Sequence, residues 1–550
     1  MIREVKDYLL KHPSIFVLLI ISWMVNISLI FPLNIRFGHD TFWHLSLINV
    51  AFQTFPPELP IFAGETLKGY NYLLDLIMYA ITIPGISATI SYFVILPIIY
   101  LIATTFFGLV FAIRYDKSAF FVGSFLFFIF LASPFSYVLS FIKQGFLFYG
   151  YHYPTTIQSV TALTNSAYAF TIPLFLIAMI ILLKKQVSQK GIIALGFLLF
   201  VAFGVKFYGG LSLAFFVSMS LFLYYFKHKN IAFLLKSAAV IGFFSAMAII
   251  IFYDPFSSVQ SGAIFGFDPL ATVYPIIENP GLFYIPYLVN ARYALIDAGG
   301  FSPRLLAIQL FTIAIYVLYN AGTRCIGFIP LGKKIFLHKV SAFEISTLST
   351  IIFTGLMSIL FIQKGGDWWN TVQFFGYALF LLNIFAASTL SSLFKKRSVI
   401  TLGIAACTII LTLPLNIELV NKSIQAIGKP SGVLVTERAA LAFLKDQEAG
   451  VVFTIPVMYT SSYVPALTHK QAYFADENIL ANMGIDYEER KKELMNLEEI
   501  DYKTLDVDYI YYLKNPEQEQ TYDASIILNT LARNQYKEIY SDKEVIVYKK

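Results

Sequence analysis

Residues 76–113 read LIMYAITIPGISATISYFVILPIIYLIATTFFGLVFAI, without one charged side chain. A transmembrane helix needs about 20 consecutive, mostly apolar residues, so this stretch is long enough to cross a bilayer. Ten further stretches of the same kind occur at 13–35, 118–142, 155–183, 191–205, 207–226, 237–253, 305–323, 345–363, 368–394 and 398–417. The pattern predicts eleven transmembrane helices.

The composition points to the same class of protein. Of the 550 residues, 57% are hydrophobic and 13% are charged, whereas soluble proteins carry roughly a quarter charged residues. The two cysteines, Cys325 and Cys407, lie in or beside apolar segments, so no disulfide framework or cysteine-based metal cluster is expected. These features exclude a soluble or disordered chain and predict a polytopic α-helical membrane protein.

Charge divides the chain into two regions. Residues 421–550 contain 15 basic and 20 acidic residues, whereas residues 1–420 contain 25 basic and 14 acidic residues. We therefore predict a transmembrane region at 1–420, with long outer loops at 34–83 and 254–303, and a soluble domain at 421–550. The basic excess lies between apolar segments, where Lys and Arg set topology, so no nucleic-acid partner is expected.

The connecting loops alternate in charge. The basic loops lie at 114–117, 184–190, 227–229, 324–339 and 395–397. Because cytoplasmic loops are enriched in Lys and Arg, we expect the N-terminus in the cytoplasm. Eleven spans then place the 421–550 domain outside the cell membrane.

The first outer loop contains GHDTFWHLSLINVAF at 38–52. Asp40 can cap a helix beginning at Thr41, and apolar residues recur at helical spacing as far as Phe52, which predicts an amphipathic helix in the membrane interface. Asp40 is either only this N-cap, or a general base for an acceptor hydroxyl, or a metal ligand with His39 or His44. Spacing alone leaves these alternatives open.

A series of short motifs follows the basic N-terminus and the first apolar stretch. They are GlyHisAspThrPheTrpHis at 38–44, PheProProGluLeuPro at 55–60, AlaGlyGlu at 63–65, TyrAsnTyr at 70–72 and, later, AspTrpTrpAsnThrValGlnPhePheGlyTyr at 367–377. This order resembles the GT-C superfamily of integral-membrane glycosyltransferases. The sequence departs from many of these proteins in having Gln373 where an Arg is common.

The resemblance implies a GT-C-like fold with a soluble extracytoplasmic domain. It implies transfer of a hexose or pentose from a polyprenyl-phosphate-linked donor to a hydroxyl of a glycan, lipid or protein acceptor. Asp40 matches the position of the catalytic carboxylate. Some members of the superfamily hold a divalent cation, so Mg²⁺ or Mn²⁺ is a candidate cofactor.

Further site residues follow from the chemistry of a leaving phosphate, which basic groups near the outer boundary must stabilise. The candidates are Arg292, Arg304, Lys206 and Lys364, with Arg292 preferred because it stands within a long outer loop. Glu65 and Asp75 are further carboxylates of the first loop and candidate catalytic or metal-binding groups. His152 is expected either on the acceptor path or in the aromatic belt at the membrane boundary.

The C-terminal domain alternates helical and strand-like patterns, which predicts a small α/β domain. Helices are expected at 436–445, 487–497 and 524–533, strands at 450–455, 471–474 and 507–513, and a hairpin at 537–548. The domain contains no phosphate-binding glycine motif or nucleophile elbow. We interpret it as accessory, with Asp476, Glu477 and Arg490 on a solvated face.

Two alternative functions remain. A polysaccharide polymerase or ligase of the cell envelope also has large outer loops, but it would use lipid-diphosphate oligosaccharides and depend on basic residues more than on Asp40. A lipid or sugar transporter would place charges within its spans and often contain inverted repeats, neither of which is evident in this sequence.

Overall fold

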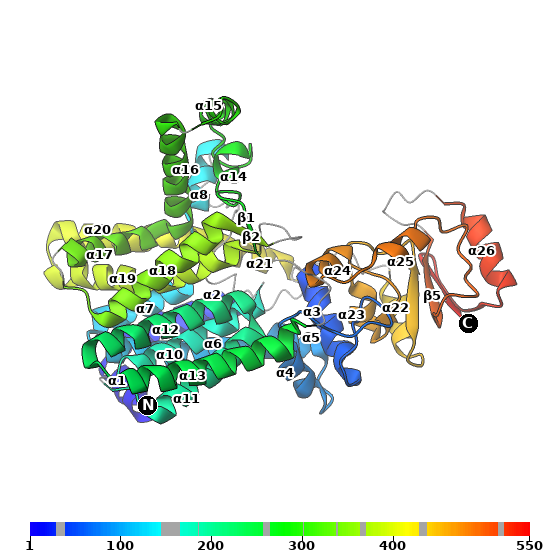
Figure 1. Ribbon diagram of the computed structural model, residues 1–550, viewed down its shortest axis with the longest axis horizontal. Helices are drawn as coiled ribbons and strands as arrows, with labels where there is room; N and C mark the ends of the chain where they lie inside the picture. Colours follow the sequence, from blue (N-terminus) through cyan, green and yellow to red (C-terminus); the bar gives the residue numbers. More distant parts are fainter. Residues whose placement is uncertain are drawn as a thin grey trace. The chain divides into compact units, whose positions relative to one another are not determined.

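The computed structural model describes residues 1–28, 39–144, 165–184, 186–256, 265–300, 302–336, 339–363, 370–427, 437–514 and 522–550. The chain divides into two compact units (Figure 1). The helical unit consists of Met1–Phe31, Pro97–Ala248 and Ala263–Gln425, and the mixed unit consists of Pro32–Leu96, Ile249–Gly262 and Ala426–Lys550.

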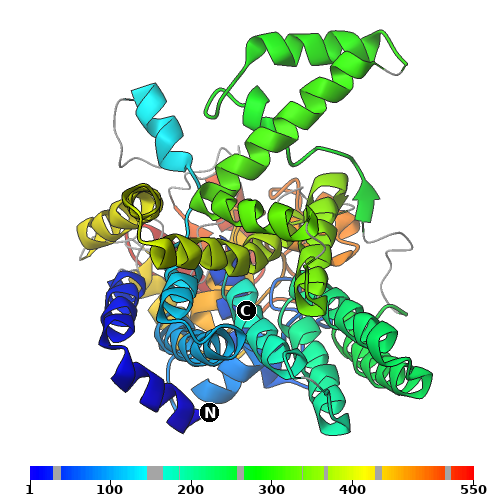
Figure 2. The same ribbon diagram turned by 90° about the vertical axis from the view of Figure 1, so that its left-hand side faces the viewer.

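The described part of the helical unit is almost entirely α-helical. Its helices are α1 (Ile2–Lys11), α2 (Pro13–Ser28), α6 (Leu96–Tyr115), α7 (Ala119–Leu131), α8 (Ser136–Gln144), α10 (Ser166–Leu182), α11 (Gln189–Val205), α12 (Phe207–His228), α13 (Ile231–Ala248), α14 (Pro275–Glu278), α15 (Pro286–Asp297), α16 (Pro303–Ala321), η5 (Gly322–Gly327), α17 (Phe328–Phe336), α18 (Ala342–Leu360), α19 (Val372–Lys396), α20 (Val399–Thr412) and α21 (Pro414–Ala426). A short ribbon pairs β1 (Phe265–Phe267) with β2 (Phe361–Gln363). In both views α15 and part of α16 project from the other helices of this unit (Figures 1 and 2).

Among the described residues, seven helices are long and apolar enough to cross a membrane, or up to nine if each of two bent pairs is one span. The bent pairs are α1 with α2 and α7 with α8. Two further predicted stretches coincide with α10 and α11, which have 17 residues each. Each of the eleven predicted stretches therefore contains a helix, and the chain is a multi-pass membrane protein.

Helix α19 is buried along most of its length, from Val372 to Ser391. It packs against α7, α18 and η5. Such close packing needs small residues at the contact. A Cβ on Gly327 of η5 would lie 2.7 Å from the backbone nitrogen of Ala386, so only glycine fits there. A helix that is apolar on all sides is stable in these buried surroundings.

The mixed unit contains a five-stranded sheet in the order β4-β3-β5-β7-β6. The strands are β3 (Val451–Ile455), β4 (Gln471–Ala472), β5 (Tyr509–Leu513), β6 (Lys537–Ser541) and β7 (Val545–Lys549). β3 runs parallel to β4 and β5, whereas β7 is antiparallel to β5 and β6.

The helices near this sheet are α22 (Arg438–Lys445), α23 (Tyr463–Thr468), α24 (Glu477–Met483), α25 (Glu488–Glu493) and α26 (Ala524–Arg533). The predicted strands, the terminal hairpin and the helices now seen as α22, α25 and α26 are confirmed within a few residues. α23 and α24 were not predicted. They have six and seven residues, too short for a periodic apolar pattern to be recognised.

The first outer loop belongs to the same core as the sheet. It forms α3 (His39–Asn49), η2 (Ala51–Gln53) and α4 (Leu73–Thr82), and α5 (Ala88–Ile90) and η3 (Ser91–Ile95) follow it in the same unit. Trp43, Leu47 and Phe62 share one cluster of buried residues with Phe453 and Ile510 of the sheet. The compact unit around the C-terminal sheet is therefore larger than the region 421–550.

The prediction that α3 is an amphipathic helix in the membrane interface is wrong. All residues from Thr41 to Ile48 are buried, including the polar Thr41, His44 and Ser46. Tertiary packing explains the difference. Helices α23 and α4 contact α3, so the side that the apolar spacing predicts to be exposed is buried.

Candidate functional site

The candidate site begins at the N-terminus of α3, where His39 and Asp40 are the first residues. A carboxylate in the first turn interacts favourably with the positive end of the helix dipole. The side chain of Asp40 is 77% exposed, so it is accessible from solvent. Asp40 is thus a carboxylate at a helix end, with its side chain at the surface.

His39 lies between two carboxylates. Its Nε2 is 2.7 Å from Oδ1 of Asp476, and its Nδ1 is 3.4 Å from Oδ1 of Asp40. Hydrogen bonds to Asp40 and Asp476 raise the pKa of His39 to about 10, against the opposing effect of burial. The ring is therefore an imidazolium at neutral pH, with a proton on each nitrogen.

Asp476 is a site residue that the sequence analysis missed, and its assignment to a solvated face is wrong. Its side chain is 0% exposed, and among the described residues its Oδ2 has no hydrogen-bond partner. Its backbone adopts the left-handed conformation, with φ of 54°. The available signal was its position, because Asp476 directly follows the apolar residues Tyr473 to Ala475.

The other two residues assigned to that face are also engaged. Glu477 pairs with Lys491, with Oε1 and Nζ 2.6 Å apart, and is partly exposed. Arg490 is partly buried and stacks on Phe62, with the guanidinium carbon 3.8 Å from the ring centroid. The prediction fails for Arg490 because its partner lies in the first outer loop, far away in sequence.

A second His–Asp pair is buried nearby. Nδ1 of His44 lies 2.8 Å from Oδ1 of Asp75, and the side chain of Asp75 is 0% exposed. The ring of His44 stacks on Tyr92, with centroids 5.4 Å apart. Burial, reinforced by the nearby Asp75 carboxylate, raises the pKa of Tyr70 well above its ordinary value. Asp75 thus has the partner that a buried carboxylate requires.

Glu65 directly follows a turn of the same loop. Its backbone oxygen accepts a hydrogen bond from the N–H of Leu59 at 2.8 Å, and its side chain is partly exposed. No direct contact of Glu65 with Asp40 or Asp75 is among the interactions that the structure describes. Substitution of Glu65 can therefore be compared with substitution of Asp40, because both are carboxylates of the first outer loop.

The described residues do not form a metal site. Across these ranges no group of three or more His, Cys, Asp and Glu side chains is arranged to hold an ion. Both ring nitrogens of His39 already face carboxylates, Nε2 that of Asp476 and Nδ1 that of Asp40. His44 directs Nδ1 at Asp75. We therefore derive no step through a metal.

Three of the candidate phosphate ligands, Arg292, Arg304 and Lys206, lie in the helical unit. Arg292 on α15 is 5% exposed, forms an ion pair with Glu278 and stacks between Tyr274 and Tyr293. Its positive charge is thus already compensated.

The other basic candidates have different surroundings. Arg304 at the start of α16 donates to the hydroxyl of Tyr287 at 2.9 Å. Lys206 precedes α12, with Nζ 5.9 Å from the ring centroid of Tyr208. Lys364 and His152 lie outside the described residues.

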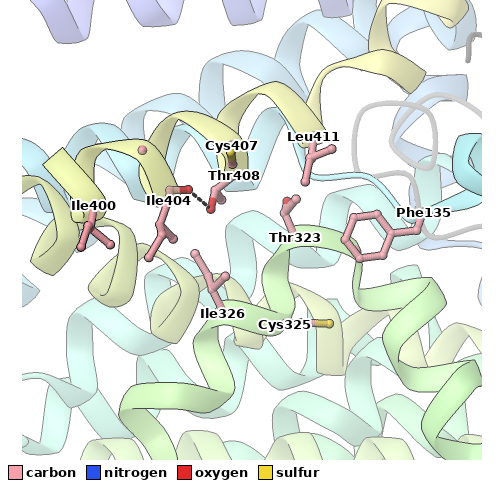
Figure 3. A pocket seen from close by; sticks show the side chains of 11 residues that line it. Phe135, Thr323, Cys325, Ile326, Ile400, Ile404, Cys407, Thr408 and Leu411 are labelled. Carbon is pink, nitrogen blue, oxygen red and sulfur yellow. Dashed lines mark hydrogen bonds between the residues drawn. The ribbon is translucent and has the colours of Figure 1, made fainter.

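An apolar groove opens in the helical unit between η5 and α20, with a cavity volume of about 440 Å³ (Figure 3). Its lining residues are Phe135, Gly322, Thr323, Cys325, Ile326, Ile400, Gly403, Ile404, Cys407, Thr408 and Leu411. The hydroxyl of Thr408 is bound within α20, because it donates to the carbonyl of Ile404 at 2.9 Å. The groove therefore presents almost only apolar surface, and none of the predicted site residues lines it.

No protein-family model and no curated protein sequence matches the chain. Among solved structures, the oligosaccharyltransferase of Archaeoglobus fulgidus in complex with Zn and sulfate is similar at a TM-score of 0.50 and 15% identity, over 90% of this chain and 68% of that one. ArnT from Cupriavidus metallidurans bound to undecaprenyl phosphate is similar at a TM-score of 0.40 and 11% identity, over 96% and 97%. At 15% identity the likeness to the oligosaccharyltransferase concerns the fold alone, and it agrees with the predicted fold class.

Proposed function

Because the chain has the GT-C fold, we propose that it is a membrane glycosyltransferase. It transfers a sugar from a polyprenyl-phosphate-linked donor to an acceptor hydroxyl at the extracytoplasmic face. The observation that carries this proposal is the exposed Asp40 carboxylate, which stands at the N-terminus of α3 beside the His39 imidazolium.

Asp40 acts as the general base. Its carboxylate takes the proton from the acceptor hydroxyl while the oxygen attacks the anomeric carbon of the donor sugar. The bond from that carbon to the phosphate oxygen breaks, and the lipid phosphate leaves with the electron pair. Attack opposite the leaving group inverts the anomeric centre. The ring of His39 lies beside this carboxylate, with Nδ1 3.4 Å from Oδ1 of Asp40.

Lys206 is the basic residue that we favour for the leaving phosphate. It lies between the C-terminus of α11 and the N-terminus of α12, a helix of 22 residues. Arg292 is less suited because Glu278 already neutralises it. Arg304, Lys364 and His152 keep their predicted roles as candidates.

The apolar groove between η5 and α20 suits the polyprenyl chain of the donor. A volume of about 440 Å³ with apolar walls takes a hydrocarbon segment within the bilayer. The proposed orientation follows from the loop charges, with the N-terminus in the cytoplasm, the C-terminal domain outside and the protein in the plasma membrane.

The function is tested with purified protein and radiolabelled donors. The panel contains polyprenyl-phosphate hexoses and pentoses, with a lipid-diphosphate oligosaccharide as the substrate of a polymerase or ligase. We expect loss of a polyprenyl-phosphate sugar in the presence of membrane extract as acceptor source. A parallel series with EDTA, then with added Mg²⁺ or Mn²⁺, tests the predicted cation. Consumption of the diphosphate donor alone would contradict the proposal.

A further inference from the structure

The first outer loop and the C-terminal sheet are joined by backbone hydrogen bonds. Ala63 N–H donates to Ala472 at 3.0 Å, Ala472 N–H donates to Pro60 at 2.8 Å, and Ala475 N–H donates to Ile61 at 2.8 Å. Residues 60–63 therefore run along the edge of the sheet at β4. This pairing ends at Ala475, directly before Asp476. It therefore fixes the position of Asp476 relative to the first outer loop.

The backbone also fixes Asp476 itself. Its N–H donates to the carbonyl of Met458 at 3.0 Å, and its φ of 54° is a conformation that few residues other than glycine, asparagine and aspartate adopt. The carboxylate is completely buried. Burial of a charged carboxylate is costly unless a cation is hydrogen-bonded to it, and His39 supplies that cation at 2.7 Å.

His39 connects this buried carboxylate with an exposed one. Its two ring nitrogens point in different directions, Nε2 toward Asp476 and Nδ1 toward Asp40. A ring nitrogen that faces a carboxylate oxygen binds it only as an N–H donor. The carboxylate of Asp40, which is 77% exposed, is therefore restrained by a ring whose own orientation is set from the protein interior.

We propose that His39 and Asp476 are positioning residues for the transfer reaction, in which Asp476 orients His39 and His39 holds the Asp40 carboxylate. This inference rests on the proposed role of Asp40 as base. It makes the C-terminal domain part of the active site through one buried side chain. Removal of that side chain lowers the rate although Asp476 touches no reacting atom.

The test compares the variants D476N and H39Q with the wild type, using the labelled polyprenyl-phosphate sugar that the wild type consumes. Asparagine keeps the shape and the left-handed conformation of Asp476 without its charge. Glutamine can replace the Nε2 donor of His39 and so keeps the hydrogen bond to Asp476. It loses the contact with Asp40. We expect kcat to fall about ten- to hundredfold in each variant with a donor KM near the wild-type value, because small misplacements of a reacting group have effects of this size. The double variant should be no slower than the single ones.

The variant E448Q is the matched control. It removes an exposed ion pair of the same domain, between Glu448 and Lys549 at 2.8 Å, and should keep the wild-type kcat. A D476N or H39Q protein that melts like the wild type and keeps its kcat would overturn the inference.

The variant D40N separates this outcome from a failure of the proposed function, because activity in D40N contradicts the role of Asp40 itself. If the wild type consumes none of the donors, the inference is tested by the melting temperatures of H39A, D476A and the double variant. Additive effects of H39A and D476A would show that the two residues are not coupled and would overturn the inference.

Discussion

Arg490 donates a hydrogen bond from Nη1 to the backbone oxygen of Ala63 at 2.9 Å, although 427 residues separate the two in sequence. The same nitrogen donates to the backbone oxygen of Tyr473, also at 2.9 Å. The guanidinium lies over the rings of Phe62 and Tyr473. One side chain thus joins the first outer loop to the sheet of the mixed unit.

Replacement of Arg490 by alanine should therefore destabilise the mixed unit by about 2–4 kcal/mol. Hydrogen bonds from a charged group contribute about 1.5–3 kcal/mol, and stacking on aromatic rings adds to this. Thermal unfolding of the purified protein measures the effect. Arg438 is exposed at the start of α22, so R438A is the control and should change stability by less than about 0.5 kcal/mol. Equal melting temperatures of the two variants would contradict the assignment.

Acid should destabilise the mixed unit through His469. Burial, together with Lys445 and Lys470, lowers the pKa of His469 to about 4, whereas a histidine in an unfolded chain titrates near 6.5. Folding therefore favours the neutral ring. The stabilisation is complete above pH 6.5 and is lost as the pH falls toward 4.

The variant H469N measures this contribution. Asparagine tolerates the positive φ of 59° at this position and does not titrate. Wild type should lose more stability than H469N between pH 7 and pH 4.5, by at most about 3 kcal/mol, because one pKa unit corresponds to about 1.4 kcal/mol. Denaturant unfolding at a series of pH values checks this, and parallel curves for the two proteins would refute it.

The basic residues should differ in their effect on donor binding. Lys206→Gln is expected to raise the donor KM about tenfold, which corresponds to about 1.4 kcal/mol of lost phosphate binding. Arg292→Gln should mainly lower stability, because it leaves Glu278 without its cation and removes the stacking on Tyr274 and Tyr293. Steady-state kinetics and melting temperatures separate the two effects. A larger change of the donor KM in Arg292→Gln than in Lys206→Gln would make Arg292 the phosphate-binding residue instead of Lys206.

A bulky side chain in the apolar groove should compete with the lipid chain. A Cβ on Gly403 meets no atom within 4 Å, so phenylalanine there extends into the groove without a clash at its base. Gly403→Phe should raise the donor KM about tenfold. Gly242 on α13 is equally open but does not line the groove, so Gly242→Phe is the control. Equal KM values for both variants would place the lipid chain elsewhere.

Local patterns predicted the secondary structure well. Apolar stretches with flanking charges coincide with the helices of the helical unit, because a spanning helix must satisfy its own backbone hydrogen bonds. The alternation of helix and strand after residue 437 likewise follows from periodicities of 3.6 and 2 residues.

The surroundings of the site were harder to predict. Asp40 was predicted as a candidate from its position and its neighbours, but its connection to Asp476 through His39 depends on a contact across 437 residues. Asp476, Glu477 and Arg490 appear in the sequence as an ordinary charged surface. Asp476 and Arg490 gain their partners His39 and Ala63 only when the first outer loop packs on the sheet, which no local periodicity encodes, whereas Glu477 pairs with Lys491 of the same domain.

The central claim concerns the Asp40 carboxylate, and the most direct measurement is donor turnover by Asp40→Asn beside Glu65→Gln. Both variants replace a carboxylate of the first outer loop by an amide of the same shape. We predict that Asp40→Asn consumes the labelled polyprenyl-phosphate sugar at least about 100-fold more slowly than the wild type, as expected for loss of a general base, while Glu65→Gln keeps most of the activity. Wild-type turnover by a folded Asp40→Asn protein would contradict the account.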